Sequence, residues 1–353
     1  MTFLSFILVG LSALLLTFLL CLVIRKVSPR MGLIDITGRE ARKDHGGKPA
    51  LVGGIAIFLG LFSISFFWLT PSSFQTFMTL FWGMAMFLAL GVYDDAKHVP
   101  ALAKLGLQIV IASIVVFGFE MKLYNLGYLN GEDLFSLGDL AGVFTVICIL
   151  VFTNAFNLVD GLDGLSGSIA LIMALTMGGI ANISGLIHIQ DVLMILAFCL
   201  CGFLILNMRS PLRKKAIIFM GDGGSLSISY ALAWAAIALG NEYSAIPLTP
   251  PPMTYAYILA YPIFDMLTVM LDRFHRGNSL FAPDTNHLHH VLKKSGLRVR
   301  VVALLLTTLA TFYAIIGLAL WICDAPQNVS LILWGVMLGA HYALYRYLVR
   351  RPA

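Results

Sequence analysis

The chain has 353 residues, of which 59% are hydrophobic and 12% are charged, and its mean hydropathy is +0.90. Soluble globular domains carry about 25% charged residues, so this composition argues against a water-soluble fold and indicates an integral membrane protein. The formal net charge of +5 does not point to nucleic-acid binding, because the basic residues lie in loops between apolar segments.

About eleven apolar runs are long enough to cross a bilayer, for which a helix needs roughly 20 residues. They lie at 3–25, 50–69, 74–93, 102–119, 141–159, 165–184, 191–208, 224–240, 253–271, 301–322 and 329–347. The first run carries no charged n-region and no cleavage site, so we read it as a retained helix. The sequence therefore predicts an all-α, polytopic membrane protein of about eleven transmembrane helices, with residues 1–353 as a single domain.

The basic residues predict the orientation of these helices. With the runs above, 22 of the 23 Lys and Arg residues fall in alternate loops, at the run ends next to those loops or in the C-terminal tail, and Lys122 alone falls on the other side. By the positive-inside rule, the side with 22 basic residues is cytoplasmic. An odd number of spans then places the N-terminus outside and the C-terminus in the cytoplasm.

In chain order, the first cytoplasmic loop holds Lys43, His45 and Lys48 just before a helix entry at Gly53–Gly54. These residues either contact an anionic substrate or only contribute to the positive-inside bias. The third run then ends in the adjacent pair Asp94–Asp95. Neighbouring carboxylates repel each other unless a cation or a donor stabilises them. The pair is either two solvated acids at a helix end or part of a metal or phosphate site.

The fifth run ends in a polar stretch that is costly beside a bilayer and is therefore a functional hypothesis by default. Asn154, Asn157 and Asp160 recur every three residues, so a helix places them on one face. The glycines that follow Asp160 and Asp163 let the backbone leave the helix and bring Asp163 toward the same place. Two converging carboxylates favour a cation, and hence phosphate chemistry.

Two further polar segments lie on the same predicted side. Asp222 lies among glycines before the eighth run, either as the N-cap of that helix or as a ligand of a divalent ion. The ninth loop carries His287, His289 and His290, of which a helix places the first and last together. With Arg273 nearby, they form a zinc site, a phosphate-binding site or a solvated loop, and zinc is the least favoured because further ligands are missing.

Asp265 lies inside the ninth apolar run, three residues after Pro262. A proline in a spanning helix frees a carbonyl and usually kinks the helix. A buried acid beside such a kink serves a site more often than a fold. Carboxylates surrounded by Lys, Arg and His are the components of metal-assisted phosphoryl transfer, with one lipid substrate and one soluble nucleotide substrate.

Together these motifs resemble the polyprenyl-phosphate N-acetylhexosamine-1-phosphate transferases, of the glycosyltransferase 4 type. The elements that match in the family's order are the Gly53–Gly54 entry, Asp94–Asp95, Asn-x2-Asn-x2-Asp-Gly-x-Asp-Gly from Asn154, Phe-Met-Gly-Asp-x-Gly-Ser from Phe219, and the histidine cluster. The His-x-His-His spacing resembles the branch that transfers GlcNAc phosphate, because the muramoyl-pentapeptide branch has three consecutive histidines.

The resemblance implies a role for each matching residue, and we combine these roles with the residues reasoned above. The predicted catalytic residues are Asp94, Asp95, Asp160, Asp163, His287 and His290. The predicted substrate-binding residues are Lys43, His45, Lys48, Asn154, Asn157, Asn207, Phe219, Arg273 and His289, with Phe219 stacking on uracil. Asp222 is the predicted ligand of Mg²⁺, or alternatively of Mn²⁺, and Asp94 and Asp95 are further candidate ligands.

The family implies transfer of GlcNAc-1-phosphate from UDP-GlcNAc to undecaprenyl phosphate, in the bacterial cytoplasmic (inner) membrane, as the first membrane step of O-antigen, enterobacterial common antigen or a related polysaccharide. The partners are these two substrates and membrane lipid, not nucleic acid, and the sequence leaves monomer and homodimer open. One alternative is a transferase that uses UDP-MurNAc-pentapeptide or another UDP-N-acetylhexosamine. A more remote alternative is a secondary transporter or lipid flippase, which would show repeated halves and polar groups at the membrane midplane.

Overall fold

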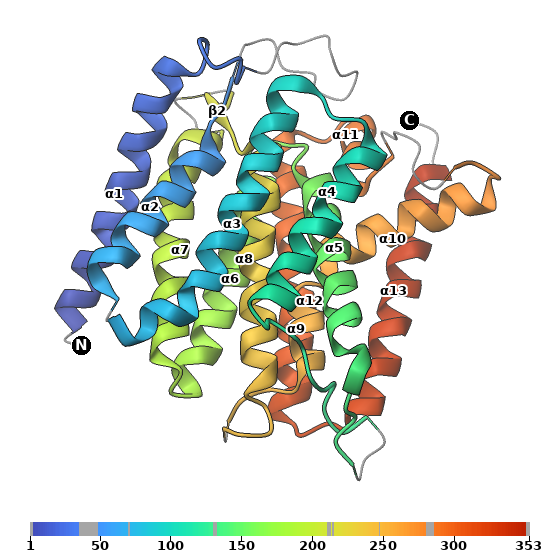
Figure 1. The fold of residues 1–353 in the computed structure, drawn as a ribbon. Helices are drawn as coiled ribbons and strands as arrows, with labels where there is room; N and C mark the ends of the chain where they lie inside the picture. Colours follow the sequence, from blue (N-terminus) through green and yellow to red (C-terminus); the bar gives the residue numbers. More distant parts are fainter. Residues whose placement is uncertain are drawn as a thin grey trace.

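The structure is a computed structural model and describes residues 3–34, 49–69, 71–129, 133–209, 213, 215–246, 248–279 and 286–350. It is a bundle of long helices, as Figure 1 shows. The helices are α1 (Phe3–Val27), α2 (Gly53–Trp68), α3 (Pro71–Lys97), α4 (Ala101–Ser113), α5 (Ala141–Val159), α6 (Leu165–Ile183), α7 (Ile187–Asn207), α8 (Gly221–Asn241), α9 (Pro252–Ile258), α10 (Ala260–His275), α11 (Leu288–Lys294), α12 (Val299–Ile322) and α13 (Gln327–Arg350). A π-helical turn, η1 (Ile114–Gly118), extends α4, and a 3₁₀ turn, η2 (Gly138–Leu140), precedes α5.

The all-α prediction is confirmed, and every predicted apolar run coincides with a helix or a helix pair. Nine helices in the described part of the chain are long and apolar enough to span a membrane, or up to ten if α9 and α10 form one broken span. About eleven were expected. The difference comes from the broken pair and from α2, which has 16 residues. At 1.5 Å per residue α2 extends about 24 Å, less than the roughly 30 Å of a bilayer's hydrocarbon core.

The run predicted at 253–271 does not form one helix. It breaks at Leu259 and the two parts, α9 and α10, meet at 69°. Pro262 is the third residue of α10, so its ring would clash with the carbonyl of Ile258 if the helix continued. The break therefore lies just before the proline, and α10 leaves the direction of the other helices (Figure 1).

Helix α8 lies at the centre of the bundle, because 89% of its apolar window is buried. It packs against α2, α3, α5 and α6. Two of these contacts depend on glycine. A Cβ atom on Gly54 would lie 2.1 Å from the Cα of Gly224, and one on Gly91 would lie 2.4 Å from the carbonyl of Asp222. The backbones of α2 and α3 thus approach the first turn of α8 more closely than any side chain would allow.

A two-stranded parallel sheet holds the starts of α2 and α8 together. Strand β1 (Ala50–Leu51) pairs with β2 (Ile218–Phe219), with Leu51 opposite Phe219. Just beyond the strands, the backbone N–H of Gly54 donates to the carbonyl of Met220 at 3.1 Å. As a result, the segment before α8 is fixed at one end of the bundle, where α3, α5 and α7 also end and α4 and α6 begin (Figure 1).

Candidate active site

Two carboxylates from different helices share one ammonium group at this end of the bundle. The Nζ atom of Lys104 in α4 lies 2.6 Å from Oδ2 of Asp94 in α3 and 2.5 Å from Oδ2 of Asp222 in α8. The side chains of Lys104 and Asp94 are only 14% and 11% exposed, whereas that of Asp222 is 34% exposed, so water screens the contact with Asp94 less than the contact with Asp222. The predicted metal ligand Asp222 and the predicted catalytic residue Asp94 therefore converge on one positive charge.

Asp95, the neighbour of Asp94, has a different set of partners. Its carboxylate accepts the backbone N–H groups of Asp222 at 3.1 Å and of Gly223 at 3.2 Å. These N–H groups belong to the first turn of α8, which carries a partial positive charge. Asp95 thus holds the start of α8 against the end of α3. The alternative that Asp222 is the N-cap of α8 is wrong, because that position belongs to Met220.

The two amides of α5 face different neighbours. The side-chain N–H₂ of Asn157 donates to Oδ1 of Asp222 at 3.2 Å and to Oγ of Ser225 at 2.7 Å. Asn154 instead donates to Oε1 of Gln108 in α4 at 2.7 Å. Residues three apart differ by about 60° around a helix, which is enough to turn one amide toward α8 and the other toward α4. We call Asp94, Asp95 and Asp222 the carboxylate cluster, and of the two amides Asn157 contacts it directly.

The chain leaves α5 after Val159 and forms the turn that holds Asp160 and Asp163. Asp160 accepts the hydroxyl of Ser166 at 2.5 Å. Asp163 accepts Nε of Arg209 at 2.6 Å and the backbone N–H of Ala216 at 3.2 Å. Among the described residues, its other oxygen is buried and has no hydrogen-bond partner, so it remains available as an acceptor.

Four predicted site residues line one pocket beside this turn. They are Asp160, Asp163, Asn207 and Phe219, and Gly221 at the start of α8 completes the wall nearest to Asp222. The amide of Asn207 is occupied by backbone, since its oxygen accepts the N–H of Gly164 at 2.8 Å and its nitrogen donates to Ile218 at 2.9 Å. Asn207 therefore holds the turn and strand β2 in place and shapes the pocket through them.

The histidine cluster is anchored on Asp265, which is fully buried in α10. Its carboxylate contacts Nδ1 of His287 at 2.8 Å and accepts the N–H of Leu288 at 2.9 Å. His287 is the N-cap of α11, outside the helix, and its ring stacks on that of His289 with centroids 5.9 Å apart. The expectation that a helix pairs His287 with His290 is wrong, because the helix starts one residue too late.

His289 lies against the turn that carries the acids. A Cβ atom on Gly161 would lie 2.3 Å from its Nε2, and within the described residues neither ring nitrogen has a hydrogen-bond partner. Burial lowers the pKa of His289 well below its usual value. Burial, together with His287 and Lys294, lowers the pKa of His290 to about 4. Both rings are neutral at physiological pH, so they act as hydrogen-bonding groups and not as cations.

Four further predicted residues are Lys43, His45, Lys48 and Arg273. Lys43, His45 and Lys48 lie outside the described residues. Arg273 is in the last turn of α10, eight residues after Asp265 and thus about 12 Å further along the helix. The sequence reading assigned Lys104 only to the positive-inside bias, although its position inside an apolar run was a signal that it serves a site.

Comparison with known proteins agrees with the predicted resemblance. Residues 77–240 match the model of glycosyl transferase family 4. The chain is 28% identical over 344 residues to the undecaprenyl-phosphate alpha-N-acetylglucosaminyl 1-phosphate transferase of Escherichia coli K12, which covers 96% of this chain and 90% of that protein. The proteins of the same name from Yersinia pestis and Haemophilus influenzae are 27% and 28% identical, over 93% and 85% of this chain and 90% and 83% of their own lengths.

Proposed function

We propose that this chain, a relative of the undecaprenyl-phosphate alpha-N-acetylglucosaminyl 1-phosphate transferases, transfers GlcNAc-1-phosphate from UDP-GlcNAc to undecaprenyl phosphate and releases UMP. The observation that carries the proposal is the convergence of Asp94 and Asp222 on the ammonium of Lys104 at the ends of membrane-length helices. A site that gathers a cation and acids beside a lipid phase suits the joining of two phosphate-bearing substrates.

The residues of the carboxylate cluster fit a divalent ion. Mg²⁺ is usually held by one or two carboxylates together with substrate phosphates, and within the described ranges no group of three or more acidic, His or Cys residues is placed to hold a metal alone. Asp222 and Asp94 would hold Mg²⁺ or Mn²⁺, whereas Asp95 is engaged with the backbone of α8. When bound, the ion would offset the negative charge that develops on the diphosphate.

The nucleophile in this reaction is an oxygen of the lipid phosphate, which attacks the β-phosphorus of UDP-GlcNAc while UMP leaves with the electrons of the broken P–O bond. A phosphate monoester has its second pKa near 6, so it is already a dianion and needs no general base. Both oxygens of Asp94 have partners, Lys104 and the N–H of Val99, and Asp95 accepts two N–H groups. This arrangement favours direct displacement over a phospho-aspartate intermediate.

The pocket of Asp160, Asp163, Asn207 and Phe219 lies next to the carboxylate cluster through Gly221, and we assign it to the uridine part of the donor. The free oxygen of Asp163 is an acceptor suited to an N–H or hydroxyl of the nucleoside. Phe219 offers a ring for stacking on uracil. The neutral imidazole of His289, beside Gly161 of the Asp160 turn, and that of His290 would donate to diphosphate oxygens.

We further propose that this end of the bundle faces the cytoplasm of a bacterium, with the protein in the inner membrane. The support is the sequence pattern, in which the predicted spans place 22 of the 23 Lys and Arg residues on one side of the membrane. A soluble nucleotide donor then reaches the site from the cytoplasm, and the lipid acceptor from the membrane. The first step of O-antigen, enterobacterial common antigen or a related polysaccharide has this topology. A homodimer is compatible with the proposal and is not required by it.

A donor panel tests the proposal. Purified protein, undecaprenyl phosphate and Mg²⁺ are mixed with UDP-GlcNAc, UDP-GalNAc or UDP-MurNAc-pentapeptide, and UMP and the lipid product are measured. We expect product with UDP-GlcNAc, and a loss of at least about 100-fold in Asp222→Asn, because one ligand charge is removed. Lys97→Met serves as the control at the exposed end of α3. Product formation only with the pentapeptide donor would refute the donor assignment.

A further inference from the structure

A cavity of about 460 Å³ lies at the opposite end of the bundle from the carboxylate cluster. Helix α8 joins the two places, since it begins beside Asp222 and ends at Asn241, two residues before the cavity residue Tyr243. Its 21 residues extend about 32 Å. The volume is in the range of about 300–1,000 Å³ that is typical of small-molecule sites. The cavity is therefore separate from the proposed donor and acceptor sites.

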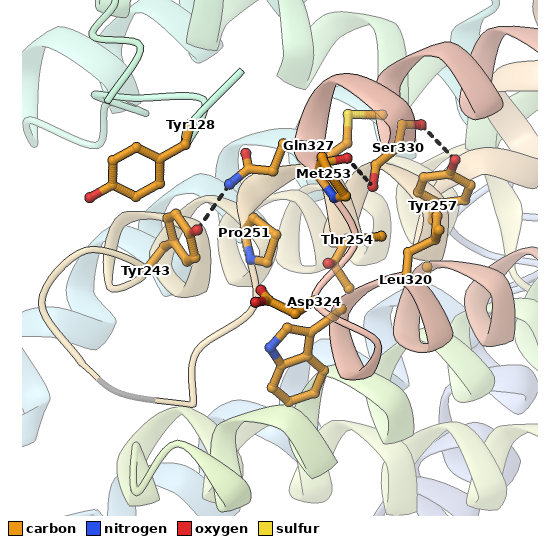
Figure 2. A pocket seen from close by; sticks show the side chains of 14 residues that line it. Tyr128, Tyr243, Pro251, Met253, Thr254, Tyr257, Leu320, Asp324, Gln327 and Ser330 are labelled. Carbon is orange, nitrogen blue, oxygen red and sulfur yellow. Dashed lines mark hydrogen bonds between the residues drawn. The ribbon is translucent and has the colours of Figure 1, made fainter. Parts of the chain in front are cut away.

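Aromatic rings form much of its wall, as Figure 2 shows. Tyr128 and Tyr243 meet edge to face with centroids 5.9 Å apart. Trp321 comes from the end of α12 and Tyr257 from α9. Tyr128, Tyr243 and Trp321 are each partly accessible, so their rings are not simply core residues. Three segments far apart in the sequence thus bring π-faces to one space.

Some hydrogen-bond donors of the wall are used within the protein. The amide nitrogen of Gln327 donates to the hydroxyl of Tyr243 at 2.9 Å, and the hydroxyl of Tyr257 donates to the carbonyl of Ser330 at 2.7 Å (Figure 2). Among the described lining residues, Asp324 contributes the one carboxylate, which is exposed at the turn between α12 and α13. A wall of π-faces with one carboxylate is suited to a cation.

The residues around the cavity carry mostly negative charge, as Asp324 does. Among the described residues that line the cavity there is no Lys, Arg or His. In the described segments between the helices at this end, Lys122 is the only Lys or Arg, and it stands against several carboxylates. These are Glu120, Asp133, Asp139, Glu242 and Asp324. Anionic ligands are therefore repelled here, and a positively charged group is attracted.

We propose that this cavity binds an organic ammonium group, held by cation–π contact with Tyr128, Tyr243 and Trp321 and by the carboxylate of Asp324. The group is carried either by a small soluble ammonium compound such as choline or ethanolammonium, or by an ammonium-bearing phospholipid headgroup. The lipid source is sterically open, because the cavity lies at the ends of α9, α12 and α13, at the level where membrane-protein Trp and Tyr meet lipid headgroups.

The test uses the full-length protein in detergent, with choline chloride as the probe and saturation-transfer NMR or calorimetry as the readout. Asp324→Asn removes the charge and keeps the backbone, because Asn readily adopts the positive φ of 49° found there. Glu242→Gln removes the same charge from a neighbouring residue outside the cavity wall. We expect Asp324→Asn to weaken choline binding about tenfold and Glu242→Gln to change it less than twofold. Equal effects of the two variants, or no choline binding at millimolar concentration, would overturn the proposal.

A second measurement keeps the proposal testable and distinguishes the two sources. Trp321→Leu removes a ring without changing the charge, and it should weaken choline binding at least fivefold. The thermal unfolding temperature checks that the variant is folded. Unchanged choline binding by the folded variant would contradict the proposal. Native mass spectrometry then compares dioleoyl-phosphatidylethanolamine with dioleoyl-phosphatidylglycerol. Retention of the ethanolamine lipid that is lost in Asp324→Asn assigns the headgroup as the source, whereas choline binding without lipid preference assigns a small soluble ammonium compound.

Discussion

Replacing Lys104 by methionine removes the ammonium that Asp94 and Asp222 share while it keeps a side chain of similar length. One oxygen of Asp94 and one oxygen of Asp222 lie within 2.6 Å of the Nζ atom of Lys104, so these two oxygens are at most about 5 Å apart. Two negative charges at that distance repel by about 3 kcal/mol at an effective dielectric constant near 20. The side chain of Asp222 is 34% exposed, and solvent screening reduces the expected loss of stability to about 1–3 kcal/mol.

The assay is thermal unfolding in detergent, first in EDTA and then in Mg²⁺. In EDTA we expect Lys104→Met to unfold roughly 2–6 °C below the wild type. If the two carboxylates form a cation site, Mg²⁺ should raise the unfolding temperature of the variant more than that of the wild type, because the ion replaces the missing ammonium. Lys97→Met, at the exposed end of the same helix as Asp94, should show neither effect. Equal unfolding of Lys104→Met and wild type in EDTA, or an equal response to Mg²⁺, would refute this reasoning.

Three further predictions follow from the packing and the histidine cluster. Asp265→Asn should weaken the contact that fixes the ring of His287. We expect the transferase rate to fall by about 10- to 100-fold with little change in KM for the donor, and an unchanged rate would contradict the positioning role of Asp265. Gly91→Ala should destabilise the protein by at least about 2 kcal/mol, because the added Cβ meets the backbone of α8. Gly106→Ala, in open space on α4, should stabilise the protein by up to about 1 kcal/mol. Thermal unfolding of the two variants measures both effects, and equal unfolding temperatures would contradict the prediction. The pKa of His290 is lowered to about 4, so between pH 6.5 and 4 the unfolded chain binds a proton that the folded chain does not. The free energy of unfolding should therefore fall as the pH is lowered through this range, and His290→Gln should reduce the fall. Equal slopes of unfolding temperature against pH for the variant and the wild type would contradict this prediction.

The helical fold was predictable because hydrophobic run length is a strong signal in a membrane, where the backbone must satisfy its own hydrogen bonds. The positions at which helices begin and end were harder to predict from the sequence. The break at Leu259 depends on where a proline falls within a helical turn, and a hydropathy window averages over that detail. The early start of α8 depends on Asp95 of α3 accepting the first N–H groups of α8, a contact between residues far apart in the chain.

The candidate site was predictable in its residue types and not in its pairings. Spacing in the sequence indicated that Asp222, Asp160 and the histidines lie on one side of the membrane, but only the packing of α3, α4 and α8 shows that Lys104 joins Asp94 to Asp222. The positive-inside rule already accounted for Lys104, and this hid the specific task of that lysine. Likewise, the partner of Asp265 lies across the loop after α10 and no local pattern reveals it.

The most direct test of the account follows the β-phosphate of the donor. UDP-GlcNAc labelled with radioactive phosphorus in that position is incubated with purified protein, undecaprenyl phosphate and Mg²⁺, and the label is followed into the organic phase. Transfer of the sugar phosphate predicts label in the lipid product and unlabelled UMP in water, both lost in Asp222→Asn. Label that stays in the aqueous phase as UDP while the sugar enters the lipid would show glycosyl transfer and contradict the central claim.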